Sequence, residues 1–261
     1  TSGLYNVAVG HKALYGNDSV VSAQYNVAIG TGAMRDLDGS SNTNTAVGHE
    51  AMREGVSCNY NTAIGSNTLN VVEGNYNVGL GYHAGLSVTS GENNLLLGKD
   101  AGVVGSPGGT INTQDNRVIL GDENITNLYC ADDSISTSDA RDKADVSNFN
   151  NGLDWINAMR PVTFKWDKRS WYINKEQFDG DLNAIVPDGT HKKTSMNVGF
   201  LAQEVLEIEK ANGFGNDNDT SLLVDLTEDE TQYGVKYSRL TPILVKAVQE
   251  LSAKVKALED A

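Results

Sequence analysis

Residues 3–122 repeat a short apolar pattern that ends in glycine. One unit reads Tyr5-Asn6-Val7-Ala8-Val9-Gly10. Its alternation places Val7 and Val9 on one face of a strand and Ala8 on the other. The Asn before the strand and the Gly after it are expected to supply the turn and positive-φ positions. A single unit cannot bury its own apolar face, so the pattern predicts a stack of short strands, a β-roll or β-helix.

The closing glycines recur at intervals of 16 to 23 residues. They are Gly10, Gly30, Gly48, Gly65, Gly81, Gly98 and Gly121. The rhythm breaks after residue 103, where residues 105–109 form a glycine-rich loop. Residues 118–120 and 125–129 read as the last strands before the pattern ends.

Residue 138 begins a different pattern, in which helices and strands alternate. Apolar positions at helical spacing predict one helix over residues 146–159, and Pro161 ends it. We expect strands at 162–166, 222–224 and 233–237, a strand running into a short helix over 197–205, and polar loops at 179–195 and 211–220.

The last helix carries a heptad seam. It is expected to begin at Ser238 or Thr241 and to run to the end of the chain. Its apolar positions step by four and three residues, and they are Leu244, Val248, Leu251, Val255 and Leu258. Such a seam indicates a partner helix, although packing of this face on its own domain is an open alternative.

Composition divides the chain near residue 137. Residues 138–261 hold 15 of the 20 Lys and Arg and all three Trp, whereas residues 1–137 hold 20 of the 27 Gly. We therefore predict two domains, 1–137 and 138–261. A net charge of −14 argues against nucleic acid and anionic membrane surfaces as partners.

Other features of the sequence bound the kind of protein. It has no apolar run long enough to span a bilayer. The chain begins with Thr1 instead of Met, and Tyr5 already belongs to a repeat in full phase, so we expect a piece of a longer protein. Cys58 and Cys130 are expected to be small buried side chains in a reducing compartment, not a disulfide framework.

The candidate chemistry lies at the composition boundary. Ser138 and Lys143 together supply the minimum for a serine–lysine nucleophile, with Asp139 and Arg141 between them. Arg141 could favour the uncharged lysine that a general base requires. The alternative is a helix start in which Ser138 is the N-cap. Five residues correspond to about 140° around a helix, so either the backbone bends or the lysine comes from a neighbouring chain.

Histidines and tyrosines in the repeats offer a second kind of candidate. His11, His49 and His83 follow repeat glycines or lie near that register, but they do not form a cluster with metal-ligand spacing. We therefore predict no metal site and no cofactor. The tyrosines before the repeat asparagines could stack on sugars or on one another.

Two resemblances bear on function. The repeats resemble the heads of trimeric autotransporter adhesins and the fibre repeats of phage tail proteins. The second half contains a set of separated motifs in a fixed order: Ser138, Asp139, Arg141, Lys143, the 161–166 strand, Gly199-Phe200, Ala202-Gln203-Glu204-Val205, Tyr237-Ser238 and the 240–251 helix. With these motifs it resembles the intramolecular chaperone of phage tail fibres and tailspikes, the S74 peptidase family.

The second resemblance implies a self-cleaving chaperone. It implies a domain that trimerises, templates the upstream β-structure and is released by cleavage between Thr137 and Ser138. Ser138 would be the nucleophile and Lys143 the base, with Asp139 and Arg141 in support. Asp142 departs from the family's common apolar residue, and its carboxylate would tend to keep Lys143 charged.

Together the two halves lead to one expectation for fold and function. A mainly β trimeric fibre of β-roll or triple β-helix repeats precedes an α+β chaperone domain that ends in a coiled-coil helix. The chain would be a homotrimeric segment of a virion tail fibre, assembled in the bacterial cytoplasm, with a bacterial surface glycan or receptor as its candidate partner. The alternative is a bacterial trimeric adhesin with a C-terminal trimerisation domain that is not cleaved.

Overall fold

The chain folds into two compact units. The computed structural model describes residues 3–16, 22–37, 40–129, 138–174, 178 and 180–261. The repeat unit combines Thr1–Leu128 with Lys168–Pro187. The C-terminal unit combines Tyr129–Asp167 with Asp188–Ala261. Thr137, on the N-terminal side of the predicted boundary, and Cys130 lie outside the described residues.

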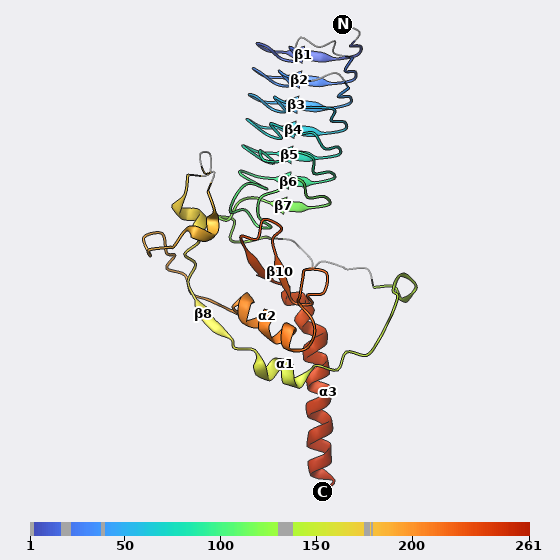
Figure 1. Ribbon diagram of the computed structural model, residues 1–261, viewed down its shortest axis with the longest axis vertical. Helices are drawn as coiled ribbons and strands as arrows, with labels where there is room; N and C mark the ends of the chain where they lie inside the picture. The colour runs from blue at the N-terminus through green and yellow to red at the C-terminus, as the bar shows by residue number, and fades with distance from the viewer. Residues whose placement is uncertain (1–2, 17–21, 38–39, 130–137, 175–177, 179) are drawn as a thin grey trace. The chain divides into compact units, whose positions relative to one another are not determined.

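The repeat unit is a β-solenoid. Its described residues contain seven three-residue strands, which pair in parallel in chain order and stack one above another in Figure 1. They are β1 (Val7–Val9), β2 (Val27–Ile29), β3 (Thr45–Val47), β4 (Thr62–Ile64), β5 (Val78–Leu80), β6 (Leu95–Leu97) and β7 (Val118–Leu120). The predicted stack of short strands is confirmed. All the pairing strands belong to one chain, so each turn sets the register of the next.

Within the inner strands of the stack, side chains alternate between the core and the outside. The middle residues of β2, β3 and β4 are Ala28, Ala46 and Ala63, and all three are fully buried. The flanking residues point outward, and Ile29 and Ile64 are exposed. Small residues suit the inward position because turns on both sides of the narrow core approach it closely. The outward positions form columns of apolar side chains along the unit.

The repeat asparagines form a buried hydrogen-bond ladder. The Asn44 Oδ1 atom accepts from the backbone N–H of Asn61 at 2.9 Å, and the Asn61 Oδ1 atom accepts from the N–H of Asn77 at 2.8 Å. Each amide nitrogen reaches a backbone carbonyl, as Asn61 Nδ2 does with Gly74 at 2.9 Å. The ladder therefore satisfies backbone groups that the short strands leave without partners.

The closing glycines have the positive φ angles that the sequence predicts, but before the strand the positive φ angle lies one residue ahead of the ladder asparagine. Tyr25 and Tyr60 have φ angles of 59° and 60°, whereas the ladder asparagines that follow them do not. A bulky residue in this region costs about 1–2 kcal/mol. Ring stacking between turns partly offsets that cost, with centroids 5.1 Å apart for Tyr60 and Tyr76. Repeat-to-repeat packing of the tyrosines is thus present.

The closing glycine is required by close approach. Gly48 has a φ of 140°, and a Cβ atom placed on it would lie 2.3 Å from the carbonyl oxygen of Gly65. No other residue fits there without moving the next turn. Beyond β7 the pattern ends: residues 125–129 form no strand, contrary to the sequence prediction. The alternation of 125–129 lacks a following turn to pair with.

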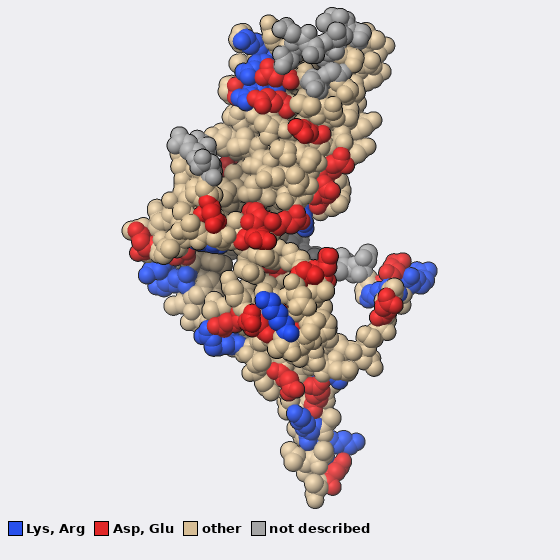
Figure 2. Space-filling view, viewed as in Figure 1, with Lys and Arg blue, Asp and Glu red and all other residues tan. Residues whose placement is uncertain are grey.

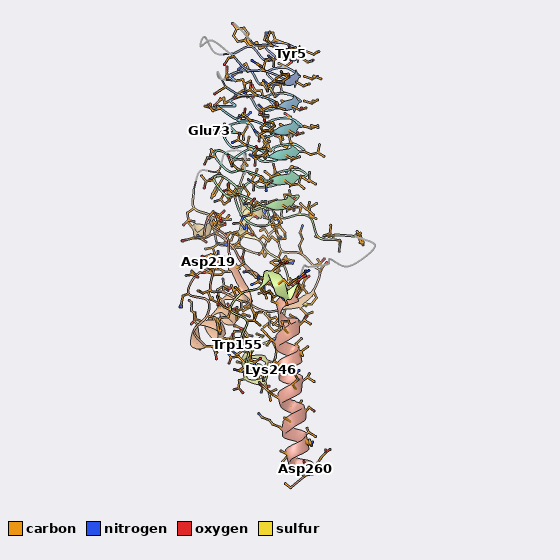
Figure 3. The ribbon with its side chains drawn as sticks, turned by 90° about the vertical axis from the view of Figure 1, so that its right-hand side faces the viewer. Tyr5, Glu73, Trp155, Asp219, Lys246 and Asp260 are labelled. Atoms are coloured by element: carbon orange, nitrogen blue, oxygen red, sulfur yellow. The ribbon has the colours of Figure 1, made fainter. Side chains whose placement is uncertain are left out.

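The C-terminal unit is a small α+β domain. Its elements are η1 (Ala140–Asp142), α1 (Leu153–Ala158), β8 (Val162–Phe164), β9 (Asn197–Gly199), α2 (Ala202–Ala211), β10 (Val224–Leu226), β11 (Tyr233–Val235), η4 (Tyr237–Arg239) and α3 (Leu240–Glu259). The strand pairs β8–β9 and β10–β11 are antiparallel. Trp155, labelled in Figure 3, is 1% exposed and packs edge-on against Phe149 and Phe214.

Helix α1 is shorter than predicted. It begins at Leu153, so the forecast of a helix from residue 146 is wrong over its first turns. Gly152 lies against α3, where an added Cβ atom would be 2.6 Å from the Ala247 nitrogen. The backbone N–H of Leu153 donates to Glu250 Oε2 at 2.7 Å, and this bond lowers the pKa of Glu250. Packing on α3 therefore decides where α1 begins.

Helix α3 has two apolar faces. Leu240, Ile243 and Ala247 are buried in the C-terminal unit. The heptad seam (Leu244, Val248, Leu251, Val255 and Leu258) is 46–78% exposed. Packing on its own domain therefore leaves the predicted seam uncovered. No described helix is long and apolar enough to cross a membrane. On the face seen in Figure 2, both acidic and basic side chains lie along the outer part of this helix.

Candidate functional site

Ser138 and Lys143 meet in one chain. Lys143 Nζ donates to Ser138 Oγ at 2.6 Å. The backbone between them bends through η1, and Lys143 leaves it with φ −114° and ψ 132°. A single 3-10 turn closes the distance that neither a regular helix nor a strand could close. Of the two options that the sequence left open, the structure shows the bend. Thr137, the other predicted member of the site, lies outside the described residues.

Asp139 and Arg141 stabilise this turn. The Asp139 side chain is the N-cap of η1 and accepts from the Arg141 backbone N–H at 2.9 Å. The Arg141 guanidinium also pairs with Asp139, with Nη2 2.6 Å from Oδ2. These bonds lower the pKa of Asp139 and raise the pKa of Arg141. The Arg141 charge is directed to Asp139 here, and not to Lys143 as the sequence suggested.

The Ser138–Lys143 pair is exposed to solvent. A serine hydroxyl becomes a nucleophile when a neighbouring base takes its proton, and a lysine can do so only as the uncharged amine. Burial is one of the conditions that favour the uncharged form. The turn thus brings the lysine amine and the serine hydroxyl into contact. A further surface that covers the turn would supply the burial that favours the uncharged amine.

The helix-start alternative is partly correct. A helical turn does begin here, but it is a three-residue 3-10 turn, and Asp139 occupies the cap position instead of Ser138. Because Ser138 is not used as a cap, its hydroxyl is available to Lys143.

Other residues that carry the family resemblance hold the C-terminal unit together. The Tyr237 hydroxyl accepts from the Phe200 N–H at 3.1 Å, and a Cβ atom on Gly199 would lie 2.4 Å from that oxygen. Glu204 pairs with Arg160. These motif residues therefore have a structural role, because their contacts join segments that are far apart in the sequence.

A buried carboxylate in the C-terminal unit is not apparent from the sequence. Glu209 on α2 is 0% exposed, and it accepts from Ser221 Oγ at 2.7 Å and from the Leu222 N–H at 2.9 Å. It also accepts from the Leu223 N–H. The helical pattern places Glu209 among charged neighbours, so nothing in the sequence distinguishes it from a solvated residue. Its role is to fix the loop that leads into β10.

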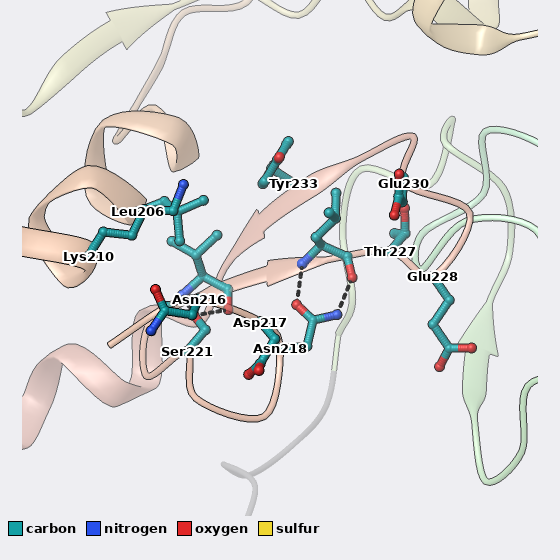
Figure 4. Close-up of a pocket in the computed structure, with 13 residues that line it drawn as sticks. Leu206, Lys210, Asn216, Asp217, Asn218, Ser221, Thr227, Glu228, Glu230 and Tyr233 are labelled. Carbon is teal, nitrogen blue, oxygen red and sulfur yellow. Dashed lines mark hydrogen bonds between the residues drawn. The ribbon is translucent and has the colours of Figure 1, made fainter. Parts of the chain in front are cut away.

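A hollow of about 370 Å³ lies beside this loop (Figure 4). Asn218 bridges it through paired hydrogen bonds to the backbone of Leu226. Asp217 accepts from the Thr220 hydroxyl at 2.7 Å, which lowers the pKa of Asp217. These side chains form hydrogen bonds to other residues of the loop and of β10, so their role is to hold the shape of the loop.

The repeat histidines do not gather. His83 is buried and lies 3.5 Å from Asp100, between Nδ1 and Oδ1. In the part of the chain that the structure describes, no group of three or more His, Cys, Asp or Glu could hold a metal ion.

One family model is similar to part of the chain. Residues 138–214 match the peptidase S74 family model, described as chaperone of endosialidase. The match begins at Ser138 and runs through β8, β9 and α2. It supports an intramolecular chaperone of this type in the second half of the chain. No curated protein matches the chain. No solved structure matches it either.

Proposed function

We propose that residues 138–261 form an intramolecular chaperone that cuts its own chain between Thr137 and Ser138. The observation that carries the proposal is the 2.6 Å contact between Lys143 Nζ and Ser138 Oγ, at the first residue of the family match. Ser138 is the nucleophile and Lys143 the general base. Asp139 and Arg141 act indirectly, because they hold the turn that joins the pair.

The reaction is an acyl shift followed by hydrolysis. Lys143 takes the Oγ proton while Oγ bonds to the carbonyl carbon of Thr137, which closes a small ring with the N, Cα and Cβ atoms of Ser138. The C–N bond breaks, and the nitrogen takes the proton back from Lys143. Water then hydrolyses the ester, leaving a carboxylate on Thr137 and a free amine on Ser138. Each chain reacts once.

Assembly would control this reaction. Among the residues that the structure describes, two apolar surfaces are uncovered in the single chain: the heptad seam of α3 and the outward columns of the solenoid, to which Ile29, Ile64 and Leu80 belong. Three copies of the chain could cover both, as a coiled coil and as packed solenoids. A neighbouring chain that also covers the Ser138 turn would exclude water from Lys143, so that cleavage follows trimer formation.

In this proposal residues 1–137 are a segment of a trimeric phage tail fibre. The solenoid and its resemblance to fibre repeats support this assignment, and a surface glycan or receptor of the host bacterium would be the partner of the fibre. A trimeric adhesin with an uncleaved C-terminal domain has the same solenoid and seam, but it has no use for the Ser138–Lys143 contact.

Gel electrophoresis of the purified full chain tests the proposal. Wild type should give two products, with the masses of residues 1–137 and 138–261. Ser138→Ala should remain full-length, while Ser147→Ala, a second exposed serine nearby, should cleave like wild type. A single full-length band from wild-type trimers would favour the uncleaved adhesin instead.

A further inference from the structure

One segment of the second half of the chain is built into the repeat unit. Residues 168–187 come after β8 and before β9, but they group with the solenoid and not with those strands. Its described residues form two short 3-10 turns, η2 (Arg169–Tyr172) and η3 (Leu182–Ala184). It lies on the C-terminal side of the proposed cut, whereas the solenoid lies on the N-terminal side.

The solenoid offers the segment a fitted surface. Ser170 is 5% exposed and lies against Gly105, which has a φ of 83°. A Cβ atom on Gly105 would lie 2.3 Å from Ser170 Cβ, so only glycine permits this approach. Lys168 Nζ donates to the backbone carbonyl of Glu123 at 2.9 Å. The glycine-rich loop that interrupts the repeat rhythm is therefore one wall of a docking site.

The loop at residues 105–109 and the 168–187 segment are each stabilised by internal hydrogen bonds. Ser106, at the centre of the loop, is fully buried, and its Oγ accepts from the Gly102 N–H at 3.1 Å. In the segment, Arg169 Nη1 donates to Asn183 Oδ1 at 2.6 Å and ties η2 to η3. Preformed surfaces lose less conformational entropy on association than flexible ones, so they bind more tightly for the same contact area.

We propose that residues 168–187 act as a latch that holds the two cleavage products together. The inference rests on the proposed function, because the latch acts only after the chain has been cut. Breaking the Thr137–Ser138 bond changes none of the contacts at Gly105 and Glu123. Separation of the 138–261 product then requires a second step, in which the latch leaves the solenoid. The partner of the latch is the end of the solenoid that contains residues 105–123.

Affinity capture of the cleaved protein tests the latch. The full chain carries a C-terminal tag, and capture is performed once no full-length band remains, since an uncut neighbour would also retain the 1–137 product. Wild type should retain that product in nearly equal amount through washing. Ser170→Arg places a long side chain at a buried position and should lower the retained amount at least about tenfold.

Two further variants serve as a control and as a milder disruption of the contact. Ala184→Arg adds the same side chain at an exposed position of the segment and should retain the product like wild type. If Ser170→Arg does not fold, Lys168→Met removes one hydrogen bond and should speed loss of the product about threefold. If the wild-type product washes away as completely as it does from Ser170→Arg, there is no latch.

A separate cut distinguishes failure of the latch from failure of the proposed function. In Ser138→Ala, a protease recognition sequence inserted before residue 138 allows an added protease to make the break. Retention after this cut supports the latch even if the wild-type chain never cleaves itself. Separation after this cut overturns the latch even if self-cleavage is efficient.

Discussion

Ser138 and Lys143 are joined by a turn whose own side chains supply its stability. Asp139 caps η1 and binds Arg141, and Lys143 then extends back towards Ser138. The ion pair in the turn is exposed, and exposed pairs contribute little stability. The Ser138–Lys143 contact is therefore formed in the single chain but held weakly, which suits a site that a neighbouring chain completes.

The base can be tested by two substitutions of Lys143. Lys143→Met keeps the stem and removes the amine, and Lys143→Arg keeps a charge that cannot be given up. Both should slow cleavage about 10²–10⁴-fold, the usual contribution of a general base. The rate is measured on gels during incubation of purified trimers. Lys165→Met, at an exposed lysine on the chain beyond β8, should cleave normally. Unchanged cleavage of Lys143→Arg would exclude lysine as the base.

At the scale of residues, the sequence indicates the Ser138–Lys143 pair but not the geometry that brings the two side chains together. Residue types and their place in the motif point to Ser138 and Lys143. The separation of about 140° holds only for a regular helix, and a three-residue turn is too short to produce a periodic signal. Closeness in sequence links Arg141 to Lys143, but in the structure Arg141 binds Asp139, since that carboxylate already lies at the N-terminus of the turn.

At the scale of elements, the asparagine ladder requires asparagine at each of its positions, because the side chains satisfy buried backbone groups. Asn61→Leu would leave the Asn77 N–H and the Gly74 carbonyl buried without these partners. Each such group costs about 1–3 kcal/mol. We therefore expect a melting temperature several degrees below that of wild type, measured by circular dichroism. Asn127→Leu, at an exposed asparagine beyond the ladder, should leave it unchanged. Equal melting of the two variants would show that the ladder contributes nothing.

The heptad seam can be tested separately from the catalytic pair. Leu251 is 51% exposed in the single chain, so an aspartate there costs little unless a partner helix covers it. Within a coiled coil, burial of that charge costs several kcal/mol per chain. Leu251→Asp should therefore be monomeric by light scattering and should not cleave. Ala253→Asp, off the seam, should remain a cleaving trimer. Efficient cleavage by a monomeric Leu251→Asp protein would show that assembly does not control the reaction.

Elements with a repeated or extended pattern could be predicted, and those set by packing could not. The alternation around Ala28 and the heptads of α3 are properties of the local sequence. The start of α1 depends on Gly152 meeting α3 and on capping by Glu250, which is 97 residues from Leu153 along the chain. The same reason explains the missing strand at 125–129, which finds no neighbouring turn on which to stack.

At the scale of the whole molecule, residues 168–187 link the second half of the chain to the repeat unit. Composition indicates one boundary near residue 137, with the second half as one continuous domain. The polar, turn-rich sequence of 179–195 suggests an exposed loop. Docking of Ser170 on Gly105 joins segments that are distant in the chain and leaves no periodic signal. A boundary in composition is therefore not a complete description of the folded units.

A chain that ends at Thr137 should fold poorly by itself. It lacks the 168–187 segment, its outward apolar columns are uncovered, and the edge of β7 is open to pairing with other chains. We expect most of it in the insoluble fraction, whereas the same segment produced by cleavage should stay soluble after removal of the 138–261 product. The strands pair within one chain, so this prediction depends on surface coverage and not on strand exchange. Soluble trimers from the short chain would remove the chaperone role.

The central claim is that Ser138 attacks the bond before it. The most direct measurement is intact mass spectrometry of the wild-type trimer, combined with N-terminal sequencing of the smaller product. The account predicts two masses that sum to the full chain plus one water, and a smaller product whose first residue is Ser138 with a free amine. An uncut mass from stable trimers, or a first residue other than Ser138, would contradict it.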